Sequence, residues 1–184
     1  SWRVRRQRYG ACFRNVRTTW LTSTNKGAGE VCEAALLNLG ITEADTEKGY
    51  LCDPASMSTL GILAIVGIVL RLTRNLDKSR GFVNGAVCIV VEQLCGNAYF
   101  VAKLVGSGNY VLVHPMEEGG CTFLPCCYGY ATTIRRAQGA SLLMGCIYFD
   151  HKYGKKERGR GYGYVAVSRF RSRGGCFLYG HKRR

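Results

Sequence analysis

Residues 131–141, ATTIRRAQGAS, form a polar cluster between two apolar segments of the chain. The flanking segments are CTFLPCCYGY (121–130) and LLMGCIYFD (142–150). Short apolar runs bounded by polar residues are typical of buried strands. The sequence therefore predicts a loop rich in hydrogen-bond donors between two buried strands.

The side chains of this loop are suited to phosphate oxygens, because hydroxyl, guanidinium and amide groups all donate to anions. The donors belong to Thr132, Thr133, Arg135, Arg136 and Gln138. Gly139 would let a backbone approach a ligand closely. Taken alone, the cluster leaves a second interpretation open, namely a solvated loop with surface arginines.

The sequence before this loop indicates an antiparallel, β-rich insert. Residues 68–76 (IVLRLTRNL) and 85–94 (GAVCIVVEQL) have strand composition, and an Asn-Gly pair between them favours a tight turn. Residues 98–116 indicate two further strands about a GSGN turn. From about residue 86 to 124 we expect a small antiparallel barrel or meander within a mixed α/β fold.

The sequence after the loop indicates further strands at residues 145–150 (GCIYFD), 163–170 (GYVAVSRF) and 175–180 (GCFLYG). Ser168 and Arg169 would terminate the middle one. Ligands of α/β sheets bind outside the carboxyl ends of strands, so Arg169 there would reach a phosphate. The alternative is again a surface arginine.

The N-terminal part of the chain gives fewer signals. Residues 29–41 (GEVCEAALLNLGI) predict an amphipathic helix with Gly40 as its C-cap. Residues 1–29 indicate coil or a short helix. The apolar run 60–70 (LGILAIVGIVL) has 11 residues, fewer than the ~20 of a membrane-spanning helix, and we expect a buried strand or two there.

Positive charge is concentrated at the two ends of the chain, whose net charge is +14. Residues 1–17 carry six Arg and no acid, and residues 151–184 carry eleven Lys and Arg against one Glu. Such clusters favour nucleic acid as a partner, because each neutralised phosphate releases counterions. A solvated basic surface is the alternative.

The ten cysteines have no C-x-x-C spacing, so we expect buried, reduced thiols and neither a zinc site nor a disulfide framework. No signal peptide is visible. We therefore expect an intracellular protein. Because the sequence does not begin with Met, we expect a fragment or a processed product.

Several catalytic motifs are absent from the sequence. It has no G-x-x-x-x-G-K-[ST] loop to hold nucleotide phosphates, and Asp150 has no second carboxylate beside it to make a magnesium site. The three histidines are scattered. The residues alone therefore do not assemble a complete active site.

Three segments together resemble a known family. They are RLTRNLDKSRGFVNGAVCIVV (71–91), YGYATTIRRAQGASL (128–142) and YVAVSR (164–169). In this order they are similar to the C-terminal third of superfamily 1 helicases that move 5′ to 3′, and most similar to the PIF family, which is related to RecD and Dda. Residues 1–58 carry no resemblance that we recognise.

The resemblance implies an α/β fold, namely a second RecA-like motor domain with an inserted SH3-like β-barrel. It implies a RecA-like domain at residues 59–87 and 123–184, and the barrel at residues 88–122. Residues 1–58 are left as an unassigned basic and helical segment.

The resemblance also implies roles for individual residues. Thr132, Thr133, Arg135 and Arg136 would bind single-stranded DNA, and Gln138 and Gly139 would couple this groove to the nucleotide. Arg169 would be the arginine finger that stabilises charge in the transition state. ATP and Mg²⁺ would bind only together with a P-loop motor domain that these residues do not contain.

The chain departs from the family pattern at three positions. Arg135 and Arg136 stand where the family has His and Lys, so charge is kept or raised, and Tyr162 replaces a Gln. Because the P-loop domain is missing, we do not expect these residues alone to hydrolyse ATP. Two other hypotheses are a non-enzymatic basic nucleic-acid-binding protein that retains the fold, and a small Cys-rich structural protein.

Overall fold

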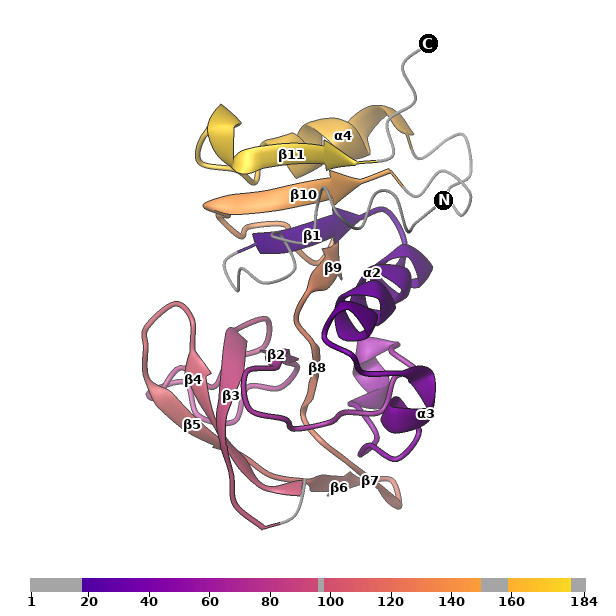
Figure 1. Cartoon of the computed structure of the whole chain (residues 1–184). Helices are drawn as coiled ribbons and strands as arrows, with labels where there is room; N and C mark the ends of the chain where they lie inside the picture. Colours follow the sequence, from indigo (N-terminus) through magenta and orange to yellow (C-terminus); the bar gives the residue numbers. More distant parts are fainter. Residues whose placement is uncertain (1–17, 96–97, 150–158, 180–184) are drawn as a thin grey trace. The chain divides into compact units, whose positions relative to one another are not determined.

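The computed structural model describes residues 18–95, 98–149 and 159–179. The chain forms two compact units, whose elements are labelled in Figure 1. The first unit comprises Ser1–Asn38 and Tyr130–Arg184, and the second comprises Leu39–Gly129.

The first unit is built on a four-stranded sheet in the order β11-β10-β1-β9, and all of its strand pairs are parallel. The elements are β1 (Thr18–Thr22), α2 (Asn25–Asn38), β9 (Ala131–Thr133), β10 (Met144–Tyr148), α4 (Gly159–Val167) and β11 (Cys176–Tyr179). The strands expected in GCIYFD and GCFLYG are thus confirmed as β10 and β11.

Strand β1 lies inside this sheet, with β10 on one side and β9 on the other. Its sequence TTWLT consists of β-branched, aromatic and aliphatic residues, and all five are buried. The expectation of coil or short helix before residue 30 is therefore wrong for β1. A strand buried on both faces shows no alternation of polar and apolar residues, and its basic neighbours in the sequence conceal it.

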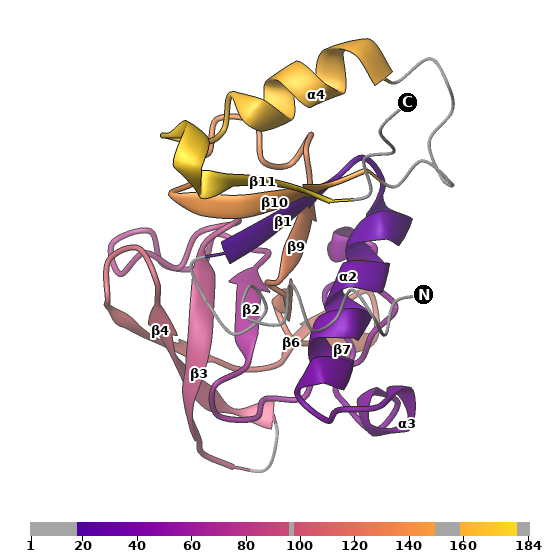
Figure 2. The same ribbon diagram turned by 45° about the horizontal axis from the view of Figure 1, so that its top comes forward.

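Helices α2 and α4 cover opposite faces of the sheet, as Figure 2 shows. Neighbouring residues of a strand point to opposite faces. Ile147 of β10 packs with Leu21 of β1 and Ala166 of α4. The next residue, Tyr148, donates a hydrogen bond of 3.3 Å to Glu30 of α2. The amphipathic helix expected at residues 29–41 is confirmed as part of α2.

Helix α4 corrects the expectation of a strand at residues 163–170. Tyr162, Val165 and Ala166 have the i, i+3, i+4 spacing of one helix face, and all three pack on the core of the first unit. The Tyr and Val content favours a strand on propensity alone, but packing against the sheet overrides it. Arg169 therefore follows a helix, and the argument from the carboxyl end of a strand does not apply to it.

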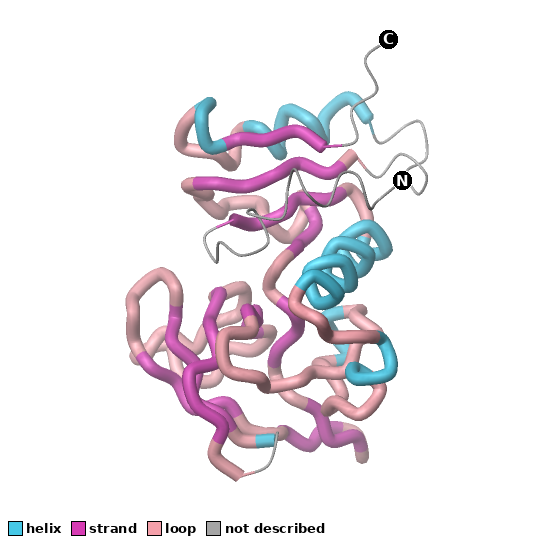
Figure 3. The backbone as a smooth tube through the Cα atoms, in the orientation of Figure 1, coloured by secondary structure: helices cyan, strands magenta, loops and turns pink. Residues whose placement is uncertain are grey.

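The second unit contains a five-stranded antiparallel sheet in the order β5-β4-β3-β2-β8 and a separate hairpin, β6-β7; Figure 3 colours its strands magenta. The strands are β2 (Val69–Leu72), β3 (Val87–Gln93), β4 (Phe100–Leu104), β5 (Tyr110–Val113), β6 (Met116–Glu118), β7 (Cys121–Phe123) and β8 (Cys126–Tyr128). Two short helices, α3 (Glu43–Thr46) and the 3-10 turn η1 (Pro54–Ser56), precede them. The predicted antiparallel meander is confirmed as β3-β4-β5.

The turn between β2 and β3 depends on the backbone conformation of a glycine. Gly85 has a φ of 90°, in the left-handed region where glycine carries no steric penalty. Its N–H donates to the carbonyl of Leu72 at 2.8 Å. The Asn-Gly pair thus lies in the turn that the sequence predicts.

The apolar run 60–70 is a strand only at its end, because β2 begins at Val69. Ile62 is buried, but Ile65 and Val66 are exposed. The expectation of one or two buried strands is therefore correct only for the last residues of the run. None of the helices in the part of the chain that the structure describes is long and apolar enough to cross a membrane.

The compact units divide the chain at other positions than the expected domains. Strand β2 hydrogen-bonds to β3 and β8, so residues 59–87 fold with residues 88–129 in the second unit. In contrast, β1 and α2 join the sheet of the first unit. Pairing between distant segments sets these boundaries, and local sequence patterns do not show it.

Candidate nucleic-acid interface

The loop that follows β9 is a series of tight turns fixed to the core by two apolar residues. Ile134 and Ala137 are buried in the core of the first unit. The N–H of Ala137 donates to the carbonyl of Thr133 at 3.0 Å. Arg135 and Arg136, which lie between the two anchors, are exposed. The packing of the loop thus directs its guanidinium-bearing residues to solvent.

The two threonines that the sequence assigns to this loop lie instead in β9, where Thr132 and Thr133 are each only 8% exposed. The hydroxyl of Thr133 accepts a hydrogen bond of 3.3 Å from the backbone N–H of Arg136. It therefore holds the first turn in the way that a capping side chain does. Contact of these threonines with DNA remains a prediction.

Gln138 and Gly139 lie at the exposed end of the loop. Gly139 has a φ of 84°, and the position that a Cβ would occupy has no atom within 4 Å. The backbone conformation therefore requires the glycine, while the space beside it is open. Such space is what the close approach of a ligand needs.

Arg169 lies beside the end of this loop, because a β-bridge joins two segments that are far apart in the sequence. Leu142 pairs in parallel with Phe170. The N–H of Leu142 donates to the carbonyl of Arg169 at 2.8 Å, and that of Arg171 donates to the carbonyl of Leu142 at 3.0 Å. The structure thus brings together the ends of two segments that the sequence singles out.

The guanidinium of Arg169 is partly held by its own helix. Its Nε donates to the carbonyl of Val165 at 3.2 Å, and its Nη2 donates to the Ser168 hydroxyl at 3.0 Å. A guanidinium has more N–H donors than these two contacts use. It could therefore bind an anion while it keeps this support.

Sequence reasoning missed the turn between β1 and α2, which lies at the same edge of the sheet. Thr22 pairs in register with Thr133, so both strands end together. Thr24 caps α2, because its hydroxyl accepts the N–H of Gly27 at 3.0 Å. A hydroxyl residue directly before an amphipathic helix is the signal that could have located this turn.

The two units differ strongly in charge. The first unit has 20 basic and 4 acidic residues, and the second has 6 basic and 8 acidic residues. Attraction for a polyanion therefore belongs to the unit that carries the loop and Arg169.

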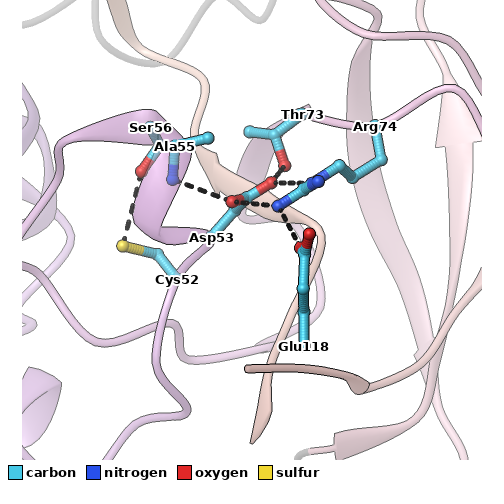
Figure 4. A network of polar contacts seen from close by, with 7 residues as sticks. All are labelled: Cys52, Asp53, Ala55, Ser56, Thr73, Arg74 and Glu118. Atoms are coloured by element: carbon cyan, nitrogen blue, oxygen red, sulfur yellow. Dashed lines mark hydrogen bonds and ion pairs between the residues drawn. The ribbon is translucent and has the colours of Figure 1, made fainter. Parts of the chain in front are cut away.

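The second unit holds an ionic network around the buried Asp53, shown in Figure 4. Asp53 accepts hydrogen bonds from Arg74 Nε and the Thr73 hydroxyl, both at 2.6 Å, and from the Ala55 N–H at 2.9 Å. Arg74 also pairs with Glu118 at 2.8 Å. Burial raises the pKa of Asp53, but the bonds from Arg74, Thr73 and Ala55 outweigh it and lower the pKa below its usual value.

This network joins three segments. Both carboxylate oxygens of Asp53 accept hydrogen bonds within it, so neither is available to a ligand. The loop before η1, the end of β2 and hairpin β6-β7 each contribute a residue to the network. Arg74 lies in one of the helicase-like segments, and its contacts here are structural. We therefore place the candidate interface in the first unit.

The described cysteines are thiols, and Cys88 and Cys126 of the antiparallel sheet are deeply buried. Burial raises the pKa of Cys88 to about 12 and that of Cys126 well above its ordinary value. Both side chains are therefore protonated and unreactive at neutral pH. Among the residues that the structure describes, no three His, Cys, Asp or Glu side chains form a group that could hold a metal ion.

Neither a family model nor a curated protein matches the sequence. Solved structures do match, and the fold they share with the chain is that of an α/β helicase domain. They are Pif1 helicases, and the resemblance to the C-terminal part of this kind of helicase is confirmed at the level of the fold.

Three of these structures illustrate the match. Pif1 helicase from Bacteroides in complex with ADP-AlF3 and ssDNA has a TM-score of 0.66 at 17% identity, over 90% of this chain and 41% of that one. Bacteroides Pif1 bound to ssDNA gives 0.61 at 18% identity, over 88% and 40%. Pif1 helicase from Candida albicans gives 0.59 at 19% identity, over 90% and 45%. The chain thus spans roughly two fifths of the length of the proteins it matches.

Proposed function

We propose that the chain is the C-terminal motor portion of an ATP-dependent DNA helicase. The observation that carries this proposal is the Leu142–Phe170 bridge, which sets the polar loop beside Arg169. Both belong to the unit that is built on a parallel sheet, and the fold of the chain resembles that of Pif1 helicases. One of those structures holds ADP-AlF3 and ssDNA together, the two ligands that such a loop and such an arginine would bind.

Single-stranded DNA is the proposed partner of the loop. Arg135 and Arg136, which are exposed residues, would contact phosphates. Thr132 and Thr133, which are buried, would fix the backbone that presents them. Contacts of this kind position a strand without reading its bases.

The nucleotide is the proposed ligand of the other end of the loop. Gln138 and Gly139 would couple the DNA groove to ATP, and Arg169 would place its guanidinium on the transferring phosphate. The exposed donors fit a polyphosphate. The described residues do not fit Mg²⁺, since they include no group of metal-binding side chains, and a P-loop domain outside these 184 residues would hold the metal.

The antiparallel sheet of the second unit would be the SH3-like barrel that interrupts such a motor domain. Its β3-β4-β5 meander and the bulge between Val90 and Glu92 support this assignment, because bulges bend a sheet toward closure. A DNA helicase of this kind would act in the nucleus or the mitochondrion.

DNA binding and ATP hydrolysis by the whole chain test the proposal. We expect weak binding of a fluorescent single strand that falls steeply with salt, and no hydrolysis of ATP. Replacing both Arg135 and Arg136 with Gln should weaken binding to all sequences alike. Turnover by the 184 residues alone would contradict the incomplete site, and unchanged binding by the double variant would contradict the DNA-binding loop.

The role of Arg169 needs the chain joined to its P-loop domain. There Arg169→Ala should reduce ATP hydrolysis by about 10³-fold or more and leave DNA binding unchanged. Arg80→Ala, an exposed arginine of the second unit, is the matched control and should have no effect. A joined protein that binds DNA without hydrolysing ATP would instead favour a non-enzymatic nucleic-acid-binding protein.

A further inference from the structure

The segment after Arg169 carries further arginines at every second position. Arg169, Arg171 and Arg173 alternate with Phe170 and Ser172. Phe170 forms a single bridge with Leu142, Arg171 and Ser172 form a bend, and Arg173 begins the short 3-10 helix η4 (Arg173–Gly175). The two arginines that follow Arg169 therefore lie in a bend and a helical turn directly after the bridge.

Phe170 anchors this segment to the core of the first unit. Its ring packs against Gly145 of β10, so closely that a Cβ on Gly145 would collide with it, and it contributes to the core of the first unit. Arg171 and Arg173, which follow this anchor, are both exposed.

Carboxylates are few among the described residues of the unit that carries these arginines. Residues 130–149 and 159–179, the described C-terminal part of the first unit, include no Asp or Glu. The described acids of this unit are Glu30 and Glu33 on α2, and Glu30 accepts a hydrogen bond from Tyr148. By contrast, Arg80 in the second unit has Asp77 at 3.6 Å.

We propose that Arg171 and Arg173 form a second phosphate-binding row, which extends the path of a single-stranded nucleic acid beyond the loop at residues 131–141. The row adjoins that loop because the Arg171 N–H donates to the Leu142 carbonyl. Arginines whose charge no nearby carboxylate offsets attract a polyanion more strongly than arginines in ion pairs do. This inference rests on the proposed function, since it lengthens the same DNA path.

The salt dependence of binding by the whole chain tests the row. With a labelled oligo(dT), each lost contact with a single strand lowers the slope of log affinity against log salt by about 0.7. The double variant Arg171→Gln, Arg173→Gln should therefore lower the slope by about 1.4. Arg80→Gln is the matched control and should leave the slope unchanged, while circular dichroism checks that each variant is folded.

Ser172 offers a second measurement that removes no arginine. Ser172→Asp places a carboxylate between Arg171 and Arg173 and should lower the slope, whereas Ser172→Asn should not. An unchanged slope in both the Asp variant and the double Gln variant would overturn the row. A loss of affinity for a fluorescent ATP analogue, with DNA binding unchanged, would also overturn its assignment to nucleic acid.

The loop variants separate this inference from the proposed function. If replacing Arg135 and Arg136 leaves DNA binding intact while the Arg171 and Arg173 variant reduces it, the row stands and the proposed groove fails. If only the loop variants reduce binding, the groove stands and the row fails. Equal and additive losses are the result we expect, because the two pairs contact different phosphates.

Discussion

Asp53 is a buried carboxylate of the second unit that is held by several hydrogen bonds. Its side chain is fully buried, whereas that of Arg74 is 30% exposed. Two bonds from Arg74 to the two carboxylate oxygens make the pair bidentate, the geometry in which guanidinium and carboxylate fit best. Removing the carboxylate would leave a partly buried cation with only Glu118 as its ionic partner and would take away the acceptor of the Thr73 hydroxyl.

Replacing Asp53 with Ala should therefore destabilise the second unit. Breaking a buried pair costs about 3–5 kcal/mol, and since Arg74 is partly solvated we expect about 2 kcal/mol. Urea unfolding measures the change. Arg80→Ala breaks the exposed pair with Asp77 and should cost less than about 1 kcal/mol; equal costs for the two variants would show that the Asp53 network contributes no more than a surface pair.

The same network should make stability depend on pH in a defined direction. The pKa of Asp53 is lowered in the folded chain, so its stabilisation is complete above about pH 4, the ordinary pKa of Asp. It is lost as pH falls through the lowered pKa. We expect Asp53→Asn to be clearly less stable than the unmodified chain at pH 7, with a difference that shrinks in acid. Urea unfolding over a pH series checks this, and a constant difference would contradict it.

At the scale of elements, α4 shows how packing selects a helix from a sequence of mixed propensity. A strand would put Tyr164 and Ala166 on the same face, because its period is two. In the helix they separate, so that Ala166 is fully buried and Tyr164 is 79% exposed. Substitutions at these two residues therefore distinguish a helix from a strand.

Enlarging Ala166 should disturb the first unit, while truncating Tyr164 should not. Ala166→Leu adds volume to a core already filled by Leu21 and Ile147 and should cost about 1–3 kcal/mol. Tyr164→Ala should change the free energy of unfolding by less than about 0.5 kcal/mol. Thermal unfolding of both variants measures this, and similar costs would favour a strand at these residues.

The elements that could be predicted from sequence are those with a local signal. The meander at β3-β4-β5 has alternating residues and glycine turns, and α2 has an apolar face and a C-cap. Strand β1 and helix α4 lack such signals, because one is buried on both faces and the other takes its shape from packing. For the candidate site, the sequence identified the loop and Arg169 as chemically relevant, but their adjacency depends on the Leu142–Phe170 bridge between segments far apart in the chain.

At the scale of the whole molecule, the first unit depends on both ends of the chain. Its strand β1 precedes the second unit in sequence, and β9, β10 and β11 follow it. Because β1 lies between β10 and β9, those two strands share no hydrogen bonds of their own. The second unit, by contrast, is continuous from residue 39 to residue 129.

Removal of residues 1–38 should therefore unfold the first unit and spare the second. Without β1, the parallel sheet loses the strand that joins β9 to β10, together with the helix that covers one of its faces. All five strands of the antiparallel sheet lie within the residues that remain. Hydrogen exchange should show amides of β10 and β11 exchanging at rates near those of an unfolded chain, while amides of β3 and β4 stay protected. Protection of β10 in the shortened chain, or loss of protection in β3, would show that the two units do not fold as separate cooperative bodies.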